Sequence, residues 1–229
     1  MQALILCGGK GLRIRGNFGS TPKPLISIRG KPLLAYIVEH YKSYGVTDFF
    51  LLVGDGESAF QAFSGMYSDE ERHIRVLQTG NNTLTGGRLS CALPFLAGEG
   101  PVLVTYGDGI ADVDIDALVA CHGASGKAVT LTVVNPRLPF GLVEFDAAGT
   151  VTSFIEKPRM TQYASAGFFV VERDVLDVLE LDADFEGFTL PLLAEEGRLG
   201  AYVHQGFWKS IDTYKDYVEI NDAAMQLPV

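Results

Sequence analysis

Residues 1–31 read MQALILCGGKGLRIRGNFGSTPKPLISIRGK and join an apolar, strand-like run, Ala3 to Cys7, to a glycine-rich turn. The segment holds six of the 18 Lys and Arg residues and no Asp or Glu. Because the whole chain has a formal charge of −10, the remaining residues sum to −16. A cationic loop at the end of a buried strand, in an otherwise acidic protein, predicts a site for a phosphate-rich ligand.

The glycines of this loop, Gly8, Gly9 and Gly11, allow backbone N–H groups to approach an anion closely. The loop is not a Walker A motif, because no Ser or Thr follows its Gly-Lys pair. It is not a dinucleotide fingerprint either, because Ile14 stands where that motif needs a small residue. The segment 54–59 fits the fingerprint loosely, so an NAD-dependent enzyme built on that segment is one alternative.

Composition bounds the class of protein. A chain of 229 residues with 47% hydrophobic content can bury a full core, and we expect a single domain. Its three cysteines and four histidines show neither a disulfide framework nor metal-ligand spacing. No secretory leader and no apolar run of transmembrane length is visible, so we expect a cytoplasmic protein without membrane contact. The acidic balance argues against nucleic acid as a partner, while the apolar C-terminal half is compatible with a homo-oligomer.

Strand-like and helix-like patterns alternate through the first half of the chain. The expected strands are 3–7, 48–53, 73–78 and 102–106, and the expected helices are 32–44, 57–66 and 89–97. This alternation predicts an α/β fold, a Rossmann-like mixed and mostly parallel twisted sheet flanked by helices. Ligands in such sheets bind outside the carboxyl ends of the strands. Both the loop after residue 7 and the Gly107–Gly109 segment lie at such ends.

The pattern becomes richer in strands after residue 127. The expected strands are 128–134, 142–145, 151–155, 166–171 and 201–204, and the expected helices are 173–179, 190–196 and one from about 213. Asp146 to Gly149 predicts a hairpin turn between the second and third of these strands. We therefore expect one domain, 1–229, in which 127–229 forms a small β-rich layer that completes a pocket begun by 1–126.

Five short motifs occur in a fixed order along the chain. They are LCGGKGLR (6–13), TPKPL (21–25), TYGDGIAD (105–112), FIEKP (154–158) and FWKSIDT (207–213). In order and rough spacing they resemble the sugar-phosphate nucleotidyltransferase family over nearly the whole chain. The resemblance implies a GT-A-like domain in which 1–126 binds a nucleotide and 127–229 binds the acceptor and closes the site.

A sixth stretch, TGNNTLTGGRL (79–89), is similar to the segment found in glucose-1-phosphate cytidylyltransferases. The resemblance therefore implies CTP as the nucleotide. The nucleotide-binding residues that it implies are Leu6, Gly8, Gly9, Gly11, Thr85, Gly86, Gly87, Arg88 and Asp108.

Nucleotidyl transfer requires positioning and charge neutralisation, because a phosphate oxygen attacks the α-phosphorus of another anion. A phosphate monoester is largely dianionic at neutral pH, so no general base is needed. The resemblance implies that Asp108 and Asp212 bind Mg²⁺, which prefers a few carboxylates together with phosphate oxygens. It also implies two catalytic cations. Arg13 would clamp the β- and γ-phosphates and stabilise the departing pyrophosphate, and Lys23 would neutralise charge at the α-phosphate.

The acceptor is the open part of this interpretation. The acceptor-binding residues that the resemblance implies are Gly141, Glu156, Lys157, Ser165, Gly167 and Lys209. Ser165 stands where enzymes for glucose-1-phosphate commonly carry an Asn, and a hydroxyl reaches less far and donates one hydrogen bond rather than two. Lys209 adds a cation that would suit an acceptor with an extra negative group.

Three interpretations therefore stay open beside the NAD alternative. Glucose-1-phosphate is the family's usual acceptor. A different sugar phosphate or a non-sugar phosphate, such as a phosphorylated amino-acid amide or an alcohol phosphate, is the second. A non-catalytic, nucleotide-binding regulatory domain is the third.

Overall fold

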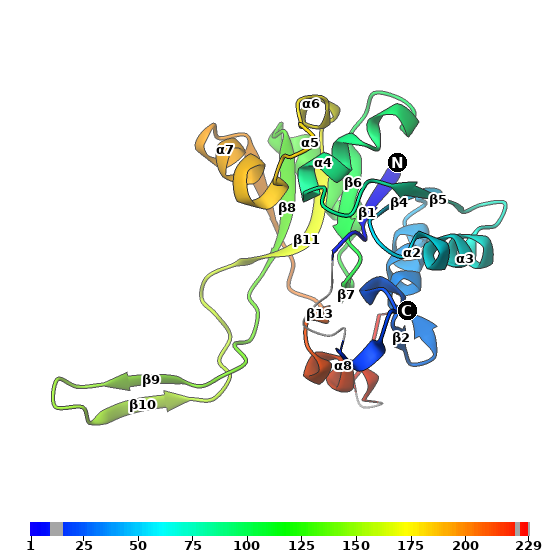
Figure 1. The fold of residues 1–229 in the computed structure, drawn as a ribbon. Coiled ribbons are helices and arrows are strands. Elements are labelled where there is room, and N and C mark those ends of the chain that lie inside the picture. The colour runs from blue at the N-terminus through cyan, green and yellow to red at the C-terminus, as the bar shows by residue number, and fades with distance from the viewer. Residues whose placement is uncertain (10–15, 223–224, 229) are drawn as a thin grey trace.

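A seven-stranded sheet forms the centre of the computed structural model, which describes residues 1–9, 16–222 and 225–228 (Figure 1). The strand order is β12-β8-β11-β6-β1-β4-β5. The strands are β1 (Gln2–Leu6), β4 (Asp48–Val53), β5 (His73–Gln78), β6 (Val102–Tyr106), β8 (Val129–Val134), β11 (Ala164–Val171) and β12 (Leu199–Val203). β11 runs antiparallel to β6 and β8, and the other neighbouring pairs are parallel. The predicted mixed, mostly parallel α/β sheet is confirmed.

Helices cover both faces of this sheet. On one face lie α2 (Leu33–Ser43), α3 (Glu57–Tyr67) and α5 (Ile115–Ser125), and on the other lie α4 (Thr85–Ser90), α6 (Arg173–Asp177) and α7 (Leu190–Glu195). Successive side chains of a strand point to opposite faces. Ala3 and Ile5 of β1 therefore join the first core, while Leu4 and Leu6 join the second. A strand that is covered on both faces must be apolar throughout, as β1 and β4 are.

A smaller cluster packs below the carboxyl ends of the central strands. Its residues come from β2 (Ser27–Ile28), β7 (Gly109–Ala111), α8 (Tyr214–Asn221) and the start of α2. The 3₁₀ turn Lys23–Leu25 and the short strands β3 (Lys31–Pro32) and β13 (Trp208–Ser210) adjoin it in the chain or by strand pairing. Its buried residues include Ile28, Ile110 and Ile211. Because β13 pairs with β7, the segment around β13 lies next to the loop that follows β6.

Two helices differ from the expectation. The helix predicted at 89–97 is α4, which begins at Thr85 and gives way to a 3₁₀ turn at Leu93–Phe95. Gly87 N–H donates to the Ala183 carbonyl, and a Cβ there would overlap the Leu181 backbone, so this close approach requires glycine. No element was expected between β6 and residue 128, yet α5 occupies Ile115–Ser125. Its apolar residues form no clear stripe, so only its Asp114 N-cap and its C-terminal glycine could have indicated it.

The strands of the second half do not gather in a layer of their own. β8, β11 and β12 complete the central sheet, whereas the hairpin of β9 (Leu142–Phe145) and β10 (Val151–Ile155) extends away from the body (Figure 1). The π-helix Phe185–Thr189 leads into α7. Within the described ranges, the structure contains no helix that combines the length and the apolar character needed to cross a bilayer.

Candidate active site

A cavity of about 210 Å³ lies where β1 and β6 end. Backbone bonds hold its walls, because Cys7 N–H donates to the Leu52 carbonyl and Gly107 N–H donates to the Leu6 carbonyl. Its lining residues are Leu6, Cys7, Gly8, Gly9, Lys23, Pro24, Thr85, Arg88, Tyr106, Gly107 and Asp108. The structure thus brings together six of the residues predicted to bind the nucleotide, and adds Lys23. Gly11 and Arg13 lie outside the described residues.

Arg88 forms the floor of this nucleotide cavity. Its side chain is only 4% exposed, and its guanidinium donates to Thr79 Oγ1 at 2.5 Å and to the Gly8 carbonyl at 3.2 Å. Burial lowers the pKa of Arg88 from its ordinary value. A Cβ at Gly8 would overlap the guanidinium, so glycine is required there by close approach. Arg88 therefore positions the loop after β1 as well as lining the cavity.

Lys23 bridges two carboxylates that are far apart in sequence. Its ammonium donates to Asp108 Oδ2 at 2.9 Å and to Asp212 Oδ1 at 2.8 Å. Burial alone would lower the pKa of Lys23, but the attraction of Asp108 and Asp212 outweighs burial and raises it. Asp212 also accepts from Ser210 Oγ at 2.5 Å, and Ile211 N–H donates to the Asp108 carbonyl. The β7–β13 pairing therefore decides where the two carboxylates meet.

These carboxylates suit a divalent cation. The Lys23 ammonium lies between them and contacts one oxygen of each, so the two carboxylates already share one positive charge. In the described parts of the chain, no group of three or more His, Cys, Asp or Glu side chains is placed to hold a metal. Mg²⁺ tolerates a small protein donor set, because it usually keeps waters and takes further oxygens from substrate phosphates. Asp108 and Asp212 are the residues that could hold it.

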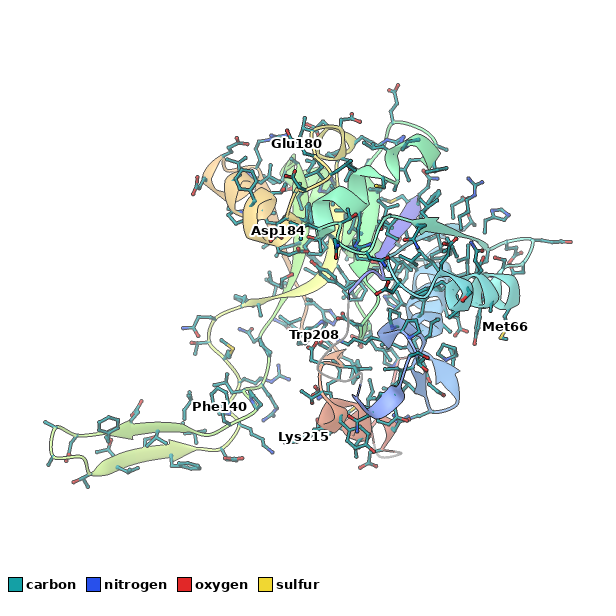
Figure 2. The ribbon with its side chains drawn as sticks, in the orientation of Figure 1. Met66, Phe140, Glu180, Asp184, Trp208 and Lys215 are labelled. Atoms are coloured by element: carbon teal, nitrogen blue, oxygen red, sulfur yellow. The ribbon has the colours of Figure 1, made fainter. Side chains whose placement is uncertain are left out.

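A second cavity of about 200 Å³ adjoins the first and shares Tyr106 and Asp108 with it. Its lining residues are Thr105, Tyr106, Asp108, Gly109, Ser165, Ala166, Gly167, Phe168, Glu186, Trp208 and Ser210. Two residues predicted to bind the acceptor, Ser165 and Gly167, line it, and we call it the acceptor cavity. Trp208 of β13 is one of these lining residues, and Figure 2 labels its side chain.

An irregularity in β11 shapes the acceptor cavity. The register between β8 and β11 shifts between Ser165 and Phe169, which frees the intervening carbonyls from the ladder. The Ala166 carbonyl accepts from Trp208 Nε1 at 2.8 Å, and the Gly167 carbonyl accepts from Thr105 Oγ1 at 2.8 Å. Gly167 has φ +79°, and a Cβ there would lie 2.5 Å from the Tyr106 ring. The bulge is therefore held by side chains from β6 and β13.

Glu186 is a residue that the sequence analysis missed. It lies in the π-helix, lines the acceptor cavity and accepts a hydrogen bond of 2.5 Å from Thr85 Oγ1. Thr85 lines the nucleotide cavity and accepts from Phe185 N–H at 3.0 Å. Glu186 thus connects the two cavities. The sequence shows only an acidic residue next to an apolar one, Phe185, at this position. Nothing in the sequence indicated that the π-helix packs against α4.

Four predicted acceptor residues lie elsewhere. Gly141, Glu156 and Lys157 belong to the projecting hairpin and its base, and none of them lines either cavity. Lys209 donates to Asp216 at 3.0 Å and to Glu219 at 2.7 Å. Burial alone would lower the pKa of Lys209, but these two carboxylates raise it. Lys209 is therefore held by the carboxylates of α8, and its role toward an acceptor stays a prediction.

The remaining predicted residues also have definite places. Gly86 is buried in α4, and a Cβ there would lie 2.8 Å from the Ala183 carbonyl oxygen, so this glycine serves packing. A Cβ at Gly54, in the segment that loosely fits a dinucleotide fingerprint, would lie 3.2 Å from Arg88 Nη2 and 3.3 Å from the carbonyl oxygens of Gly8 and Gly80, so this glycine also serves packing.

Comparison with known proteins identifies the family of this chain. Glucose-1-phosphate cytidylyltransferase of Salmonella typhi is 36% identical over 241 residues, which cover 95% of this chain and 93% of that protein. Mannose-1-phosphate guanyltransferase beta-B of Xenopus laevis is 32% identical over 228 residues, covering 95% of this chain and 63% of that protein. The crystal structure of HddC from Yersinia pseudotuberculosis superposes with a TM-score of 0.75 at 21% identity, covering 96% and 98% of the two chains. The family described as "Nucleotidyl transferase" matches residues 2–226. With that match and these identities over nearly its full length, the chain belongs to the nucleotidyl transferase family of enzymes.

Proposed function

We propose that the enzyme is a Mg²⁺-dependent cytidylyltransferase, which joins CTP and a small phosphorylated acceptor into a CDP-linked product and pyrophosphate. The observation that carries this proposal is the position of Asp108, which lines both cavities and shares Lys23 with Asp212. A carboxylate at that junction lies where the phosphates of the two substrates would meet. Support for CTP comes from the stretch 79–89 and from the Salmonella typhi relative, which is named a glucose-1-phosphate cytidylyltransferase.

The roles of the residues follow from charge. A phosphate oxygen of the acceptor forms a bond to the α-phosphorus of CTP, and the bond to the β-phosphate oxygen breaks, so that pyrophosphate leaves with that electron pair. Bound Mg²⁺ would supply positive charge to the phosphate oxygens, with Asp108 and Asp212 as its protein ligands. Lys23, at the rim of the nucleotide cavity, would neutralise charge on the α-phosphate. Arg88 holds the loop on which the triphosphate would rest.

The acceptor cavity offers hydrogen-bonding groups to a polyol. Ser165 provides a hydroxyl, and Glu186 provides a carboxylate that accepts hydrogen bonds. Glucose-1-phosphate is the acceptor with the best support, because it is named for the Salmonella typhi relative. Another phosphorylated sugar, or a non-sugar phosphate, is the alternative that the short Ser165 side chain favours.

Pyrophosphate release tests the proposal. The enzyme would be incubated with Mg²⁺ and CTP, UTP, dTTP, GTP or ATP against a panel of sugar and non-sugar phosphates. We expect release with CTP and one class of acceptor, a loss of at least about 100-fold in Asp108→Asn, and normal activity in Asp116→Asn, an exposed carboxylate on α5. Preference for another nucleotide would refute the CTP assignment. Near-normal turnover of Asp108→Asn would refute the role of the junction carboxylate.

A further inference from the structure

The short antiparallel pair of β7 and β13 carries both carboxylates of the proposed metal site at one of its ends. Asp108 directly precedes β7, and Asp212 follows two residues after the end of β13. Each strand has only three residues, with Ser210 opposite Gly109. A two-stranded pair of this length is at best marginally stable by itself, and a slip of one residue would move Asp212 by about 3.4 Å. The end that is remote from the carboxylates must therefore be held by other contacts.

His204 holds that remote end. Its Nε2 atom lies 3.0 Å from Asp112 Oδ1 and 3.0 Å from the Phe207 carbonyl oxygen. Both neighbours are hydrogen-bond acceptors, so Nε2 carries a proton and donates to them. The Phe207 carbonyl also accepts from Asp112 N–H at 3.1 Å, which continues the β7–β13 ladder by one step. We call His204, Asp112 and the Phe207 carbonyl the clasp.

The clasp joins the β7–β13 pair to the central sheet. His204 is only 8% exposed, and its backbone N–H donates to the Val133 carbonyl of β8 at 2.9 Å. The turn that follows is tight, because a Cβ at Gly206 would overlap the Asp112 carboxylate and would lie 2.7 Å from His204 Cε1. An enclosed side chain with two acceptors on one nitrogen has little freedom to turn. The position of β13 relative to the central sheet therefore depends on His204.

Contacts at the other end of the pair pass this position on to the two carboxylates. Ile211 N–H donates to the Asp108 carbonyl at 3.0 Å, and Ser210 Oγ donates to Asp212. Mg²⁺ demands near-ideal octahedral geometry, with oxygen ligands at about 2.0–2.1 Å. A small displacement of one carboxylate relative to the other therefore lowers the affinity for the metal.

We propose that His204 and Asp112 are positioning residues, which fix β13 against β7 so that Asp108 and Asp212 stand at the separation that one divalent cation requires. This inference rests on the proposed function, since it takes the two carboxylates as ligands of Mg²⁺. Neither His204 nor Asp112 lines the nucleotide cavity or the acceptor cavity. Their effect reaches the site through β13, so loss of the clasp weakens metal binding and leaves the nucleotide cavity intact.

Binding of Mn²⁺ in the presence of CTP and without an acceptor tests the proposal apart from turnover. Mn²⁺ prefers the same octahedral oxygen coordination as Mg²⁺, and electron paramagnetic resonance measures its free concentration. We expect His204→Ala to weaken Mn²⁺ binding at least about tenfold. His204→Gln should restore most of the affinity, because its amide N–H can replace Nε2–H. The affinity for CTP without metal should stay nearly unchanged. Equal Mn²⁺ affinity in the wild type and His204→Ala would overturn the proposal.

His122 provides the matched control, because it lies beside the amino end of β8, at the opposite end of the sheet. It is 3% exposed, and its ring nitrogens lie 2.9 Å from Thr130 Oγ1 and 3.1 Å from Glu172 Oε1. His122→Ala, like His204→Ala, removes an enclosed imidazole with two hydrogen-bonding neighbours, so both should lower the free energy of unfolding in urea. Only His204→Ala should weaken Mn²⁺ binding. Equal losses of Mn²⁺ affinity in the two variants would show a general structural effect and overturn the proposal.

A double variant tests whether His204 and Asp112 act as one unit. Asp112→Ala alone should weaken Mn²⁺ binding about as much as His204→Ala, and the double variant should bind no more weakly than the weaker single variant. Losses that multiply would show that the two residues act independently and would overturn the clasp. A wild type that binds CTP but no Mn²⁺ would instead contradict the metal site of the proposed function, and with it this inference.

Discussion

Replacing Gly8 with alanine tests whether the buried Arg88 guanidinium positions the loop after β1. A Cβ at Gly8 would overlap the guanidinium carbon and two of its nitrogens, so the arginine must move by about 1 Å or more to reach normal contact. That movement weakens the hydrogen bonds to the Gly8 carbonyl and Thr79 Oγ1. Overpacking costs about 1–3 kcal/mol, and a lost hydrogen bond to a charged group costs about 1.5–3 kcal/mol. Because the two losses overlap, we expect Gly8→Ala to lower the free energy of unfolding by about 2–4 kcal/mol.

A double-mutant cycle separates this cause from a general loop defect. Arg88→Ala removes the group that the new methyl would strike, so Gly8→Ala should cost less than about 1 kcal/mol in that background. The coupling energy should then be about 1–3 kcal/mol. Gly9→Ala is the matched control, since no atom of the described residues lies within 4 Å of a Cβ at Gly9. Urea denaturation of the wild type, the two single variants and the double variant measures the cycle, provided that their m-values agree.

The affinity for CTP measures the functional effect of the same substitution. Gly8→Ala should weaken CTP binding at least about tenfold and leave acceptor binding to the second cavity nearly unchanged, because Gly8 lines only the nucleotide cavity. If Gly8→Ala destabilises the Arg88→Ala protein as much as the wild type, the guanidinium is not the cause, and the positioning role of Arg88 is refuted.

Three further substitutions probe other parts of the molecule. Trp208→Phe should lower the free energy of unfolding, measured by urea denaturation, by about 1–2 kcal/mol, because the Ala166 carbonyl loses its indole donor. The same substitution should raise the KM for the acceptor more than the KM for CTP, and equal increases in the two KM values would contradict this prediction. Thr213→Ala should lower the free energy of unfolding by about 1 kcal/mol, because it removes the capping box of α8. Thr213→Ser keeps the hydroxyl and should restore most of that stability; no restoration would contradict the role of the cap. Burial lowers the pKa of His40 despite its hydrogen bond to the Val113 carbonyl. The neutral imidazole therefore contributes fully to stability above about pH 6.5, the pKa of histidine in the unfolded chain. This contribution is lost as the pH falls toward the lowered pKa of the folded state. His40→Gln should flatten the stability profile between about pH 7 and 5, and an unchanged slope would exclude His40 as its source.

Local patterns were sufficient for most of the central strands. The expected bounds of β4, β5 and β6 match the structure, because these strands are dense in apolar residues and end at glycine or polar segments. α5 escaped prediction because its apolar residues do not form a stripe, although buried packing of Ile115 and Leu118 makes it a stable helix. Tertiary contacts override a weak local period in such a case.

Half of the candidate site followed from motif chemistry. Gly8, Thr85, Arg88 and Asp108 line one cavity; the place of Gly8 after a strand indicated a phosphate loop, whereas Thr85, Arg88 and Asp108 were implied by the family resemblance. Glu186 could not be found in this way, because its role depends on the contact between the π-helix and α4. The ion pairs of Lys209 could not be found either, since its contact with Glu219 depends on how α8 packs against β13.

The sequence by itself determined the alternation of strands and helices, the glycine-rich loop after the first strand, and the types of residue that a phosphate site requires. Only the tertiary structure decided that Lys23 lies between Asp108 and Asp212, residues separated from it by 85 and 189 positions. It also decided that the hairpin of β9 and β10 projects from the body (Figure 1). The physical reason is that strand and helix patterns depend on neighbours a few residues away, whereas a charge pair depends on strand order and on the pairing of β7 with β13.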